Sequence, residues 1–554
     1  MTSPASRVAR GALGCGAASV ALLAGTAFLG DSAAVPGLGA ATLLPPWDVG
    51  ARPSSSLVTA LLGVAWTLGA AAVALGLLAL RRGFTWNGRR TALLGAVAVL
   101  TLVVVPPLGS ADHLSYAAYG RIKALGGDPY VERPAQWRGG ADPVAGAVQP
   151  PWQDTASVYG PVATLAQTAT AVVGDGSLRR TVWAWQLLCG LAFLAAGLAL
   201  DRLAAAMSRR RRCAARTPAV LSAPSVDPAR LRVAVLWTLN PLLLGQLVLG
   251  AHVDVLAAAF AVGALALAAR RPFVAGALVA AAVATKAPFA LVGLALLWGA
   301  RRLPRRDAVR SLALGLLGAG LVLVPAHLWT GPHTYDQLQR ASKFVSFATP
   351  WRLLADQLDP VLGRPAVRGL VTPAAAVLAV LLAVLLVRRL TALLPALLPV
   401  LRPALRPAPS PAQPPLPVSS RPQTSLDKGE KTPGVGSSGV SGGAAGDAMV
   451  VDAVRALGVT AVGWVLTAPY ALPWYDCLAW LPLVLLAPSG LDLAMLGRLW
   501  VLALAYVPGR VVGMSPDVEA LTLGFRRSVA PWLTLATLCW TVWWAVTARR
   551  RPSS

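Results

Sequence analysis

One aspartate stands just beyond the end of an apolar run, in a chain that has few acidic residues. The run TALLGAVAVLTLVVVPPL, residues 91–108, is followed by GSADHLSYAAYGRIKALGGDPY, which places Asp112 at the edge of the apolar segment. A carboxylate at such a boundary is partly desolvated, which raises its proton affinity toward that of a useful general base while water still reaches it. Capping of a short helix over residues 114–127 is the alternative role, and the two roles are compatible.

Aromatic side chains follow this aspartate and recur in two later stretches, SVYGPVATL at 157–165 and PYALPWYDC at 469–477. Tyr and Trp gather where a membrane meets water, so an interfacial belt is one interpretation. The other interpretation is a platform on which a sugar stacks. The aromatic candidates for sugar binding are Tyr116, Tyr119, Tyr130, Tyr159, Trp474 and Tyr475.

Three ionisable residues lie in or beside apolar runs. His252 and Asp254 belong to NPLLLGQLVLGAHVDV at 240–255, and Lys286 belongs to VATKAPF at 283–289. A charge at the centre of a bilayer costs about 2.5–3.5 kcal/mol on insertion scales, so each needs a partner. His252 and Asp254 either pair with each other, cap the next helix, or reach a shared pocket. Lys286 either meets an anion, such as a phosphate or Asp254, or extends to the surface.

Cations also occur in loop 327–352, HLWTGPHTYDQLQRASKFVSFATPWR, which carries His333, Arg340 and Lys343. Guanidinium and ammonium groups bind phosphate oxygens, so these residues, with Arg121 and Lys286, are candidates for recognising a lipid phosphate. An amphipathic interfacial helix is the alternative for this loop. The sequence has no carboxylate cluster that demands a metal, so we expect no metal and no cofactor.

The composition predicts the elements that position these residues. Of 554 residues, 56% are hydrophobic and 13% are charged, and several apolar runs reach the roughly 20 residues that a helix needs to cross a bilayer. The runs are rich in Leu, Ala and Val without the alternation of a barrel strand, so helices are expected. We predict an all-α polytopic membrane protein of about 12 spanning helices. Two further stretches, 161–176 and 273–299, are expected to be re-entrant or interfacial.

The net charge of +26 comes from 49 basic and 23 acidic residues. Arginine clusters stand at the ends of apolar runs, which is the topology signal of membrane proteins, so the expected partner is the lipid bilayer and not nucleic acid. With these clusters in the cytoplasm, segment 109–160, turn 251–254, loop 327–352 and turn 471–477 all emerge on the other side. The pattern therefore predicts a multi-pass protein of the cell membrane with an active site on the extracytoplasmic face.

A Pro-, Ser- and Gly-rich stretch divides the chain. Residues 402–448 cannot bury a core and are predicted to form a disordered cytoplasmic linker. The chain then consists of a first membrane block, 1–401, which carries the outer loops, and a second membrane block, 449–554.

Taken in order, ADHLSYAAYGRIKALGGDPY, SVYGP, NPLLLGQLVLGAHVD, ATKAPF and PWY resemble a known family. This family comprises the actinobacterial polyprenyl-phosphomannose-dependent α-(1→6)-mannosyltransferases, which are multi-span glycosyltransferases of the GT-C class. The resemblance covers most of residues 90–480. At 251–254 family members tend to read GHND, whereas this chain reads AHVD.

The resemblance implies that a sugar passes from a polyprenyl phosphate to a hydroxyl of a growing mannan or glycolipid acceptor, with inversion at the anomeric carbon. The family's aspartate in the first outer loop maps onto Asp112, which the resemblance makes the general base. Cations would then stabilise the departing lipid phosphate.

A transporter or lipid flippase is the rival reading, because a membrane-embedded Lys286 and a re-entrant hairpin also suit a translocation path. The distribution of polar residues favours the enzyme, since the polar clusters gather on one face.

Overall fold

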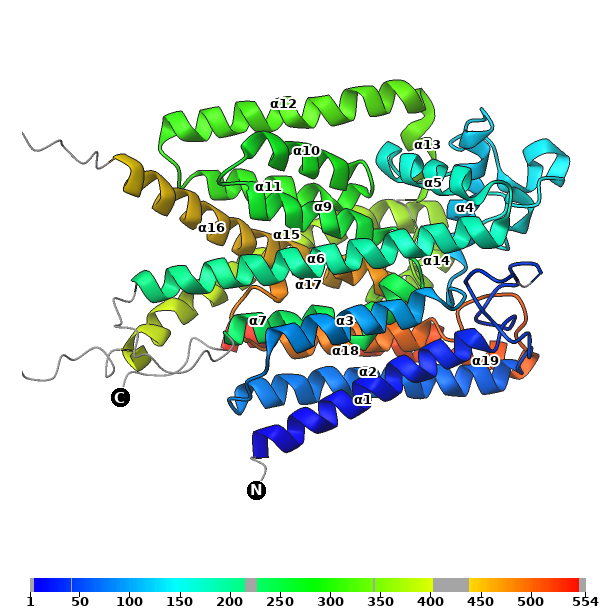
Figure 1. The fold of residues 1–554 in the computed structure, drawn as a ribbon, viewed down its shortest axis with the longest axis horizontal. Helices are drawn as coiled ribbons and strands as arrows, with labels where there is room; N and C mark the ends of the chain where they lie inside the picture. The colour runs from blue at the N-terminus through cyan, green and yellow to red at the C-terminus, as the bar shows by residue number, and fades with distance from the viewer. Residues whose placement is uncertain (1–3, 41, 215–226, 342–343, 402–437, 548–554) are drawn as a thin grey trace, which may run out of the picture.

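The helices run side by side along one axis and form a bundle (Figure 1). The structure is a computed structural model that describes residues 4–40, 42–214, 227–341, 344–401 and 438–547. Among these residues there is no β-strand, so the all-α prediction is confirmed. The α-helices are α1 (Pro4–Phe28), α2 (Ser55–Arg81), α3 (Gly88–Val103), α4 (Asp112–Ala124), α5 (Pro161–Gly174), α6 (Leu178–Ala214), α7 (Pro228–Val233), α8 (Pro241–Leu243), α9 (Asp254–Leu267), α10 (Pro272–Val283), α11 (Ala290–Ala300), α12 (Arg305–Thr330), α13 (Asp336–Ala341), α14 (Pro350–Leu362), α15 (Arg364–Leu401), α16 (Ser438–Thr467), α17 (Cys477–Leu483), α18 (Leu491–Ala505), α19 (Pro516–Gly524) and α20 (Ala530–Thr547).

Eight helical segments of the described residues are long and apolar enough to cross a membrane. Four shorter apolar helices, Arg90–Val103, Asp254–Leu267, Pro272–Val283 and Ala287–Ala300, accompany them. The expected number of about 12 spans stays a prediction. The eight long segments are Pro4–Phe28, Ser55–Arg81, Leu178–Arg209, Pro228–Leu249, Arg305–Thr330, Arg364–Leu390, Ala444–Thr467 and Pro516–Thr547.

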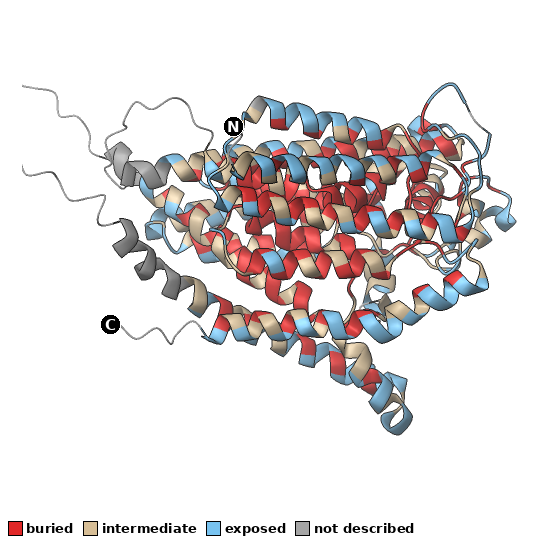
Figure 2. Cartoon of the chain, turned by 90° about the horizontal axis from the view of Figure 1, so that it is seen from below, coloured by how far each residue is buried: buried red, intermediate tan, exposed pale blue. Residues whose placement is uncertain are grey.

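Burial separates central from peripheral segments (Figure 2). Segment Pro228–Leu249 is 83% buried in its apolar window, whereas Arg305–Thr330 is 6% buried. Helix α9 is mostly buried as well and follows directly after the turn at 250–253. The turn that carries His252 therefore joins two of the most deeply packed elements of the bundle.

The segments expected on one face of the membrane do meet at one end of the bundle. Lys123, in α4, donates from Nζ to the carbonyl of Trp329 at 3.3 Å, and Ser346 Oγ donates to the carbonyl of Ala471 at 3.1 Å. The first turns of α1 and α16 lie at the opposite end (Figure 1). Which membrane side each end faces stays a prediction.

The two stretches that were expected to be re-entrant or interfacial form short helices. Residues 161–176 contain α5, and residues 273–299 contain α10, the 3-10 turn η5 (Ala287–Phe289) and α11. Val162 N donates to the carbonyl of Ala284 at 2.9 Å, and a Cβ on Gly160 would come within 2.2 Å of that oxygen. Only glycine therefore permits the start of α5 to pack on the tip of the α10–α11 hairpin.

The expected linker is only partly within the described residues. Residues 402–437 lie outside them, while the stretch 438–448 belongs to α16, so the second helical block begins before residue 449. The division into two membrane blocks stays a prediction.

Candidate functional site

A tight turn presents Asp112 at the start of α4. Ala111 adopts a left-handed backbone with φ of 60°, and the Asp112 amide donates to Ser110 Oγ at 3.2 Å. The N-cap of α4 is Ala111 and no side chain caps this helix, so Asp112 does not have the capping role considered as its alternative. Its side chain is 12% exposed. The carboxylate is therefore held at the helix start but left available for another task.

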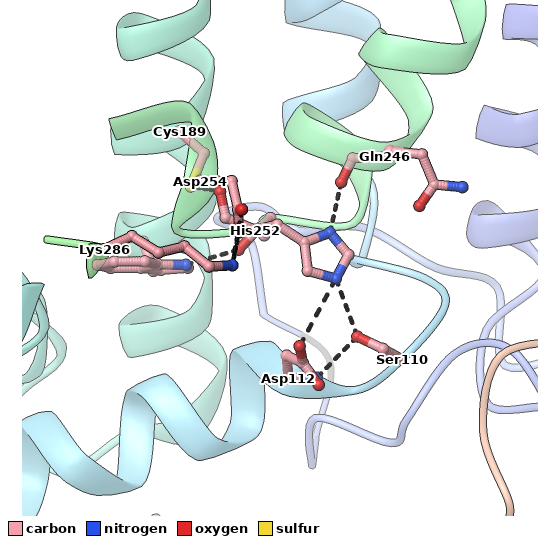
Figure 3. Close-up of polar contacts among 9 residues, drawn as sticks. Ser110, Asp112, Cys189, Gln246, His252, Asp254 and Lys286 are labelled. Carbon is pink, nitrogen blue, oxygen red and sulfur yellow. Dashed lines mark hydrogen bonds and ion pairs between the residues drawn. The ribbon is translucent and has the colours of Figure 1, made fainter. Parts of the chain in front are cut away.

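His252 lies against this turn (Figure 3). Its Nε2 is 3.0 Å from Ser110 Oγ and 3.8 Å from the nearer carboxylate oxygen of Asp112. Its Nδ1 contacts the carbonyl of Gln246, which only accepts, so Nδ1 carries the proton and Nε2 is the acceptor nitrogen. Burial lowers the pKa of His252 to about 3, so the ring is neutral near pH 7 and its contact with Asp112 is not an ion pair. His252 and Asp254 do not pair with each other.

The electrostatics of Asp112 suit proton transfer. Burial raises its pKa to about 7, while the Ser110 hydrogen bond and the charge of Lys286 act in the lowering direction and Asp254 adds a smaller raising effect. A general base works best when its pKa is near the operating pH, because it is then both ionised and sufficiently basic. The direction of this shift is the one expected for a carboxylate at the end of an apolar run, and the role of Asp112 as general base stays a prediction.

Asp254 and Lys286 form a buried ion pair beside this turn. Asp254 is the first residue of α9, and Lys286 lies at the tip of the α10–α11 hairpin. Lys286 Nζ is 2.6 Å from both carboxylate oxygens of Asp254 and lies 3.7 Å from the ring centre of Tyr475. Of the two partners proposed for Lys286 the structure shows the carboxylate, so the charge of this lysine is already balanced.

Aromatic rings from distant segments pack around these groups. Trp474, in the 3-10 turn η8 (Pro473–Asp476), stacks on His252 with ring centres 3.6 Å apart. Tyr159 contacts Tyr116 edge-on at 5.1 Å and Tyr119 at 6.3 Å. Tyr159 and Tyr475 are partly exposed, whereas the other rings are buried, so these two are the ones a sugar can reach.

Four predicted residues have their recorded contacts elsewhere, and a fifth cannot be placed. Arg121 pairs with Asp142 at 3.1 Å, and the Tyr130 hydroxyl is 2.7 Å from Thr164 Oγ1. His333 and Arg340 are exposed and contact their own segment, Asp336 at 2.9 Å and Gln337 at 3.3 Å respectively. Lys343 lies outside the described residues. The structure thus brings together Asp112, Tyr116, Tyr119, Tyr159, His252, Asp254, Lys286, Trp474 and Tyr475.

Two functional neighbours were not predicted. Ser110 orients both His252 and the Asp112 amide, and Trp185 supports the turn by donating from Nε1 to the carbonyl of Ala251 at 2.7 Å. Ala251 itself is left-handed with φ of 52°, at the position where the resembled family tends to have glycine. The spacing of Ser110, two residues before the aspartate, is the signal that could have found it.

Two cavities among the described residues are relevant to ligand binding. A small cavity of about 20 Å³ is bordered by Ser110, Gln246, Trp474 and Tyr506, which is room for one water and not for a sugar. A larger cavity of about 530 Å³ lies between α1, α2 and α3 and has an almost entirely apolar lining. The second cavity contains none of the candidate site residues, so we do not place the chemistry there.

Comparison with known proteins identifies the family of the chain. A sequence model of a family described as alpha-(1->6)-mannopyranosyltransferase, N-terminal domain, matches residues 12–302, just over half of the chain. Alpha-(1->6)-mannopyranosyltransferase B of Corynebacterium glutamicum is 30% identical over 154 residues, which are 28% of this chain and 22% of that relative. The matched stretch thus spans about a fifth of the relative's length, and no solved structure matches the chain. Since the matched region contains Asp112, His252, Asp254 and Lys286, the polar cluster lies within it, and the chain belongs to the alpha-(1->6)-mannopyranosyltransferase family.

Proposed function

We propose that this protein transfers mannose from a polyprenyl-phosphate-linked donor to a hydroxyl of a mannan or glycolipid acceptor, forming an α-(1→6) linkage on the extracytoplasmic face of the membrane. The observation that carries the proposal is the buried Asp112, whose pKa of about 7 is set by burial and tuned by Ser110 and Lys286. It lies at the end of the bundle where the polar and aromatic segments converge, in a family named for this transfer.

The proposed reaction is a single displacement. The acceptor hydroxyl oxygen attacks the anomeric carbon, its proton passes to the Asp112 carboxylate, and the bond from that carbon to the phosphate oxygen breaks. The electron pair of this bond leaves with the polyprenyl phosphate. Because the attack inverts the anomeric centre and the product is α-linked, the donor must be the β-linked mannosyl phosphate.

The neighbours of Asp112 have supporting roles in this proposal. The neutral His252 and Ser110 hold the carboxylate side of the turn in place, and neither competes for the proton near pH 7. The Asp254–Lys286 pair and the exposed faces of Tyr159 and Tyr475 offer hydrogen bonds and a stacking surface to the sugar. No step requires a metal, because a phosphate is already a good leaving group.

The test is incubation of the purified protein with polyprenyl-phosphate-linked mannose and a short α-(1→6)-mannoside. We expect extension of the acceptor by one mannose through an α-linkage. An α-mannosidase should then remove this added mannose. Transfer only from another lipid-linked sugar would discard mannose but keep the class. Movement of the lipid-linked sugar across proteoliposomes without any transfer would favour the flippase reading instead.

The pH dependence of transfer follows from the Asp112 pKa. The base must be ionised to accept a proton, and burial raises the pKa of Asp112 to about 7. The logarithm of kcat/KM should therefore rise with pH with a slope of one below about pH 7 and level off above it. Initial rates between about pH 5 and pH 9 measure this limb. A rate that is already constant above about pH 5, as expected for a carboxylate of ordinary pKa, would contradict the assignment.

A further inference from the structure

Two adjacent arginines interrupt the last candidate membrane span. Arg526 and Arg527 lie within Pro516–Thr547, in the π-helical turn η9 (Phe525–Val529) between α19 and α20. Charged residues inside a span are rare and mark functional sites by default, and π-helical turns inside helices are frequent at such sites. Two independent features of this segment therefore point to a role beyond spanning the membrane.

Neither arginine has a carboxylate partner among the described residues. Nearby arginines do have one: Arg352 pairs with Asp356, and Arg498 pairs with Asp476 at 3.0 Å. Arg526 donates from Nε to the carbonyl of Ala505 at 2.6 Å, which fixes the guanidinium and leaves its terminal amino groups to face other partners. Among the described residues, the recorded hydrogen bond of this fixed group is to a neutral carbonyl.

Aromatic contacts connect Arg526 to the candidate site. Its guanidinium carbon lies 4.4 Å from the ring centre of Tyr506, and Tyr506 contacts Trp474 edge-on at 5.6 Å. Trp474 in turn stacks on His252, beside Asp112. The small cavity of about 20 Å³ bordered by Ser110, Trp474 and Tyr506 has room for one water, so the connection between the Asp112 turn and Arg526 runs through these packed rings.

A second arginine pair flanks the same surface. The guanidinium carbons of Arg527 and Arg352 lie 4.7 Å and 5.1 Å from the ring centre of Phe347, so both cations gather on one side chain of the loop that follows α13. Next to them α19 and α20 expose apolar side chains, among them Leu521 and Trp532, which are 64% and 59% exposed. Arg527, which has no ion-pair partner among the described residues, therefore adds a positive charge beside an apolar surface that a lipid tail can follow, whereas Asp356 balances the charge of Arg352.

We propose that Arg526, with Arg527 beside it, binds the phosphate of the polyprenyl-linked sugar donor, whose prenyl chain runs along the exposed apolar side of α19 and α20. The inference rests on the proposed function. As the bond between the anomeric carbon and the phosphate oxygen breaks, the phosphate gains one negative charge, and a guanidinium stabilises it through paired hydrogen bonds. Lys286 is less suited to this task because both oxygens of Asp254 already hold it.

The test compares Arg526→Gln and Arg526→Lys with the matched control Arg364→Gln. Arg364 stands at the start of α15 with 80% of its side chain exposed and pairs with Asp359 at 3.9 Å, so the control removes the same charge from an exposed position that has no recorded contact with Arg526 or Arg527. Binding of polyprenyl monophosphate, measured by displacement of a fluorescent analogue in micelles, needs no turnover. Steady-state kinetics on the lipid-linked mannose give KM and kcat.

We expect Arg526→Gln to weaken binding of polyprenyl monophosphate and to lower kcat/KM by roughly a hundredfold, the scale for loss of one charge-stabilising donor. Arg526→Lys should fall between Gln and wild type, because it keeps the charge but loses the planar donor pair. Arg364→Gln should behave as wild type. If Arg526→Gln does not fold, the test uses Arg526→Lys and Arg527→Gln. Weaker binding of polyprenyl monophosphate by these variants supports the phosphate site, and unchanged binding by both overturns it.

Other outcomes separate the inference from the proposed function. Wild-type affinity in a folded Arg526→Gln, with mannose transfer intact, overturns the phosphate site and leaves the function standing. Arginine-dependent binding in a protein that transfers no mannose supports the site and removes the function. Equal displacement of polyprenyl monophosphate by phosphatidylglycerol identifies a general headgroup contact and overturns the assignment to the donor.

Discussion

Replacing Asp112 with Asn should lower the rate of mannose transfer by a factor of roughly 10² to 10⁴, the range that a general base contributes. Asparagine has the same shape but cannot accept the acceptor's proton. The fold should not suffer, because a neutral amide removes the cost of ionising a buried carboxyl whose pKa burial has raised to about 7. The measurement is kcat/KM for the lipid-linked donor together with a melting curve in detergent.

The control for this substitution is Asp154→Asn. Asp154 is an exposed acid in the same outer segment, and its recorded contact is with the neighbouring Gln153. It should retain wild-type turnover. Near-normal transfer by a folded Asp112→Asn protein would remove this carboxylate from the chemistry and leave its place at the cluster without a catalytic explanation.

Replacing Arg232 with Met should destabilise the protein by about 3–5 kcal/mol, because it leaves a buried carboxylate without its cation. Arg232 in α7 forms an ion pair with Asp492 in α18, with the two side chains 4% and 0% exposed, and also donates to the carbonyl of Leu483 at 2.9 Å. The double variant Arg232→Met, Asp492→Leu should recover most of the loss, since no charge then stays buried alone. Denaturant-induced unfolding in micelles gives the free energy difference.

An exposed ion pair provides the comparison. Arg302 pairs with Asp452 at 2.6 Å, but its side chain is 57% exposed, so Arg302→Met should cost no more than about 1 kcal/mol. If the double variant at 232 and 492 were as unstable as the single one, packing rather than charge would explain the role of Arg232.

Local sequence rules were enough for the fold class and for several of the residues that the structure brings together near Asp112. Long apolar runs without alternation can only be helices in a bilayer, and a charge within such a run needs a partner, which is why Asp254 was one of the partners considered for Lys286. Prediction was weaker for cations in polar loops. Arg121 and Arg340 have partners within their own segments, and nothing in a loop's composition reveals whether a short-range partner exists.

What sequence reasoning missed depends on long-range packing. The stack of Trp474 on His252 joins positions 222 residues apart, and no periodicity encodes such a distance. Arg526 and Arg527 did carry a signal, because two cations precede an apolar run on the side where the charge rule expects few. The two arginines stand just before the last apolar run and were therefore not among the predicted site residues. Only the structure shows which rings they contact.

The His252–Trp474 stack also bears on how such proteins diverge. In the proposed mechanism, the groups that handle the proton come from residues 110–286, whereas Trp474, Tyr475 and the following helices lie beyond the stretch that matches the family model. If Arg526 and Arg527 bind the donor phosphate as proposed, we expect substitutions in the later part of the chain to change the preferred lipid while the earlier part stays constant. Chimeras of two family members, joined within residues 402–437 between α15 and α16, would exchange the later part of the chain and keep the earlier part unchanged.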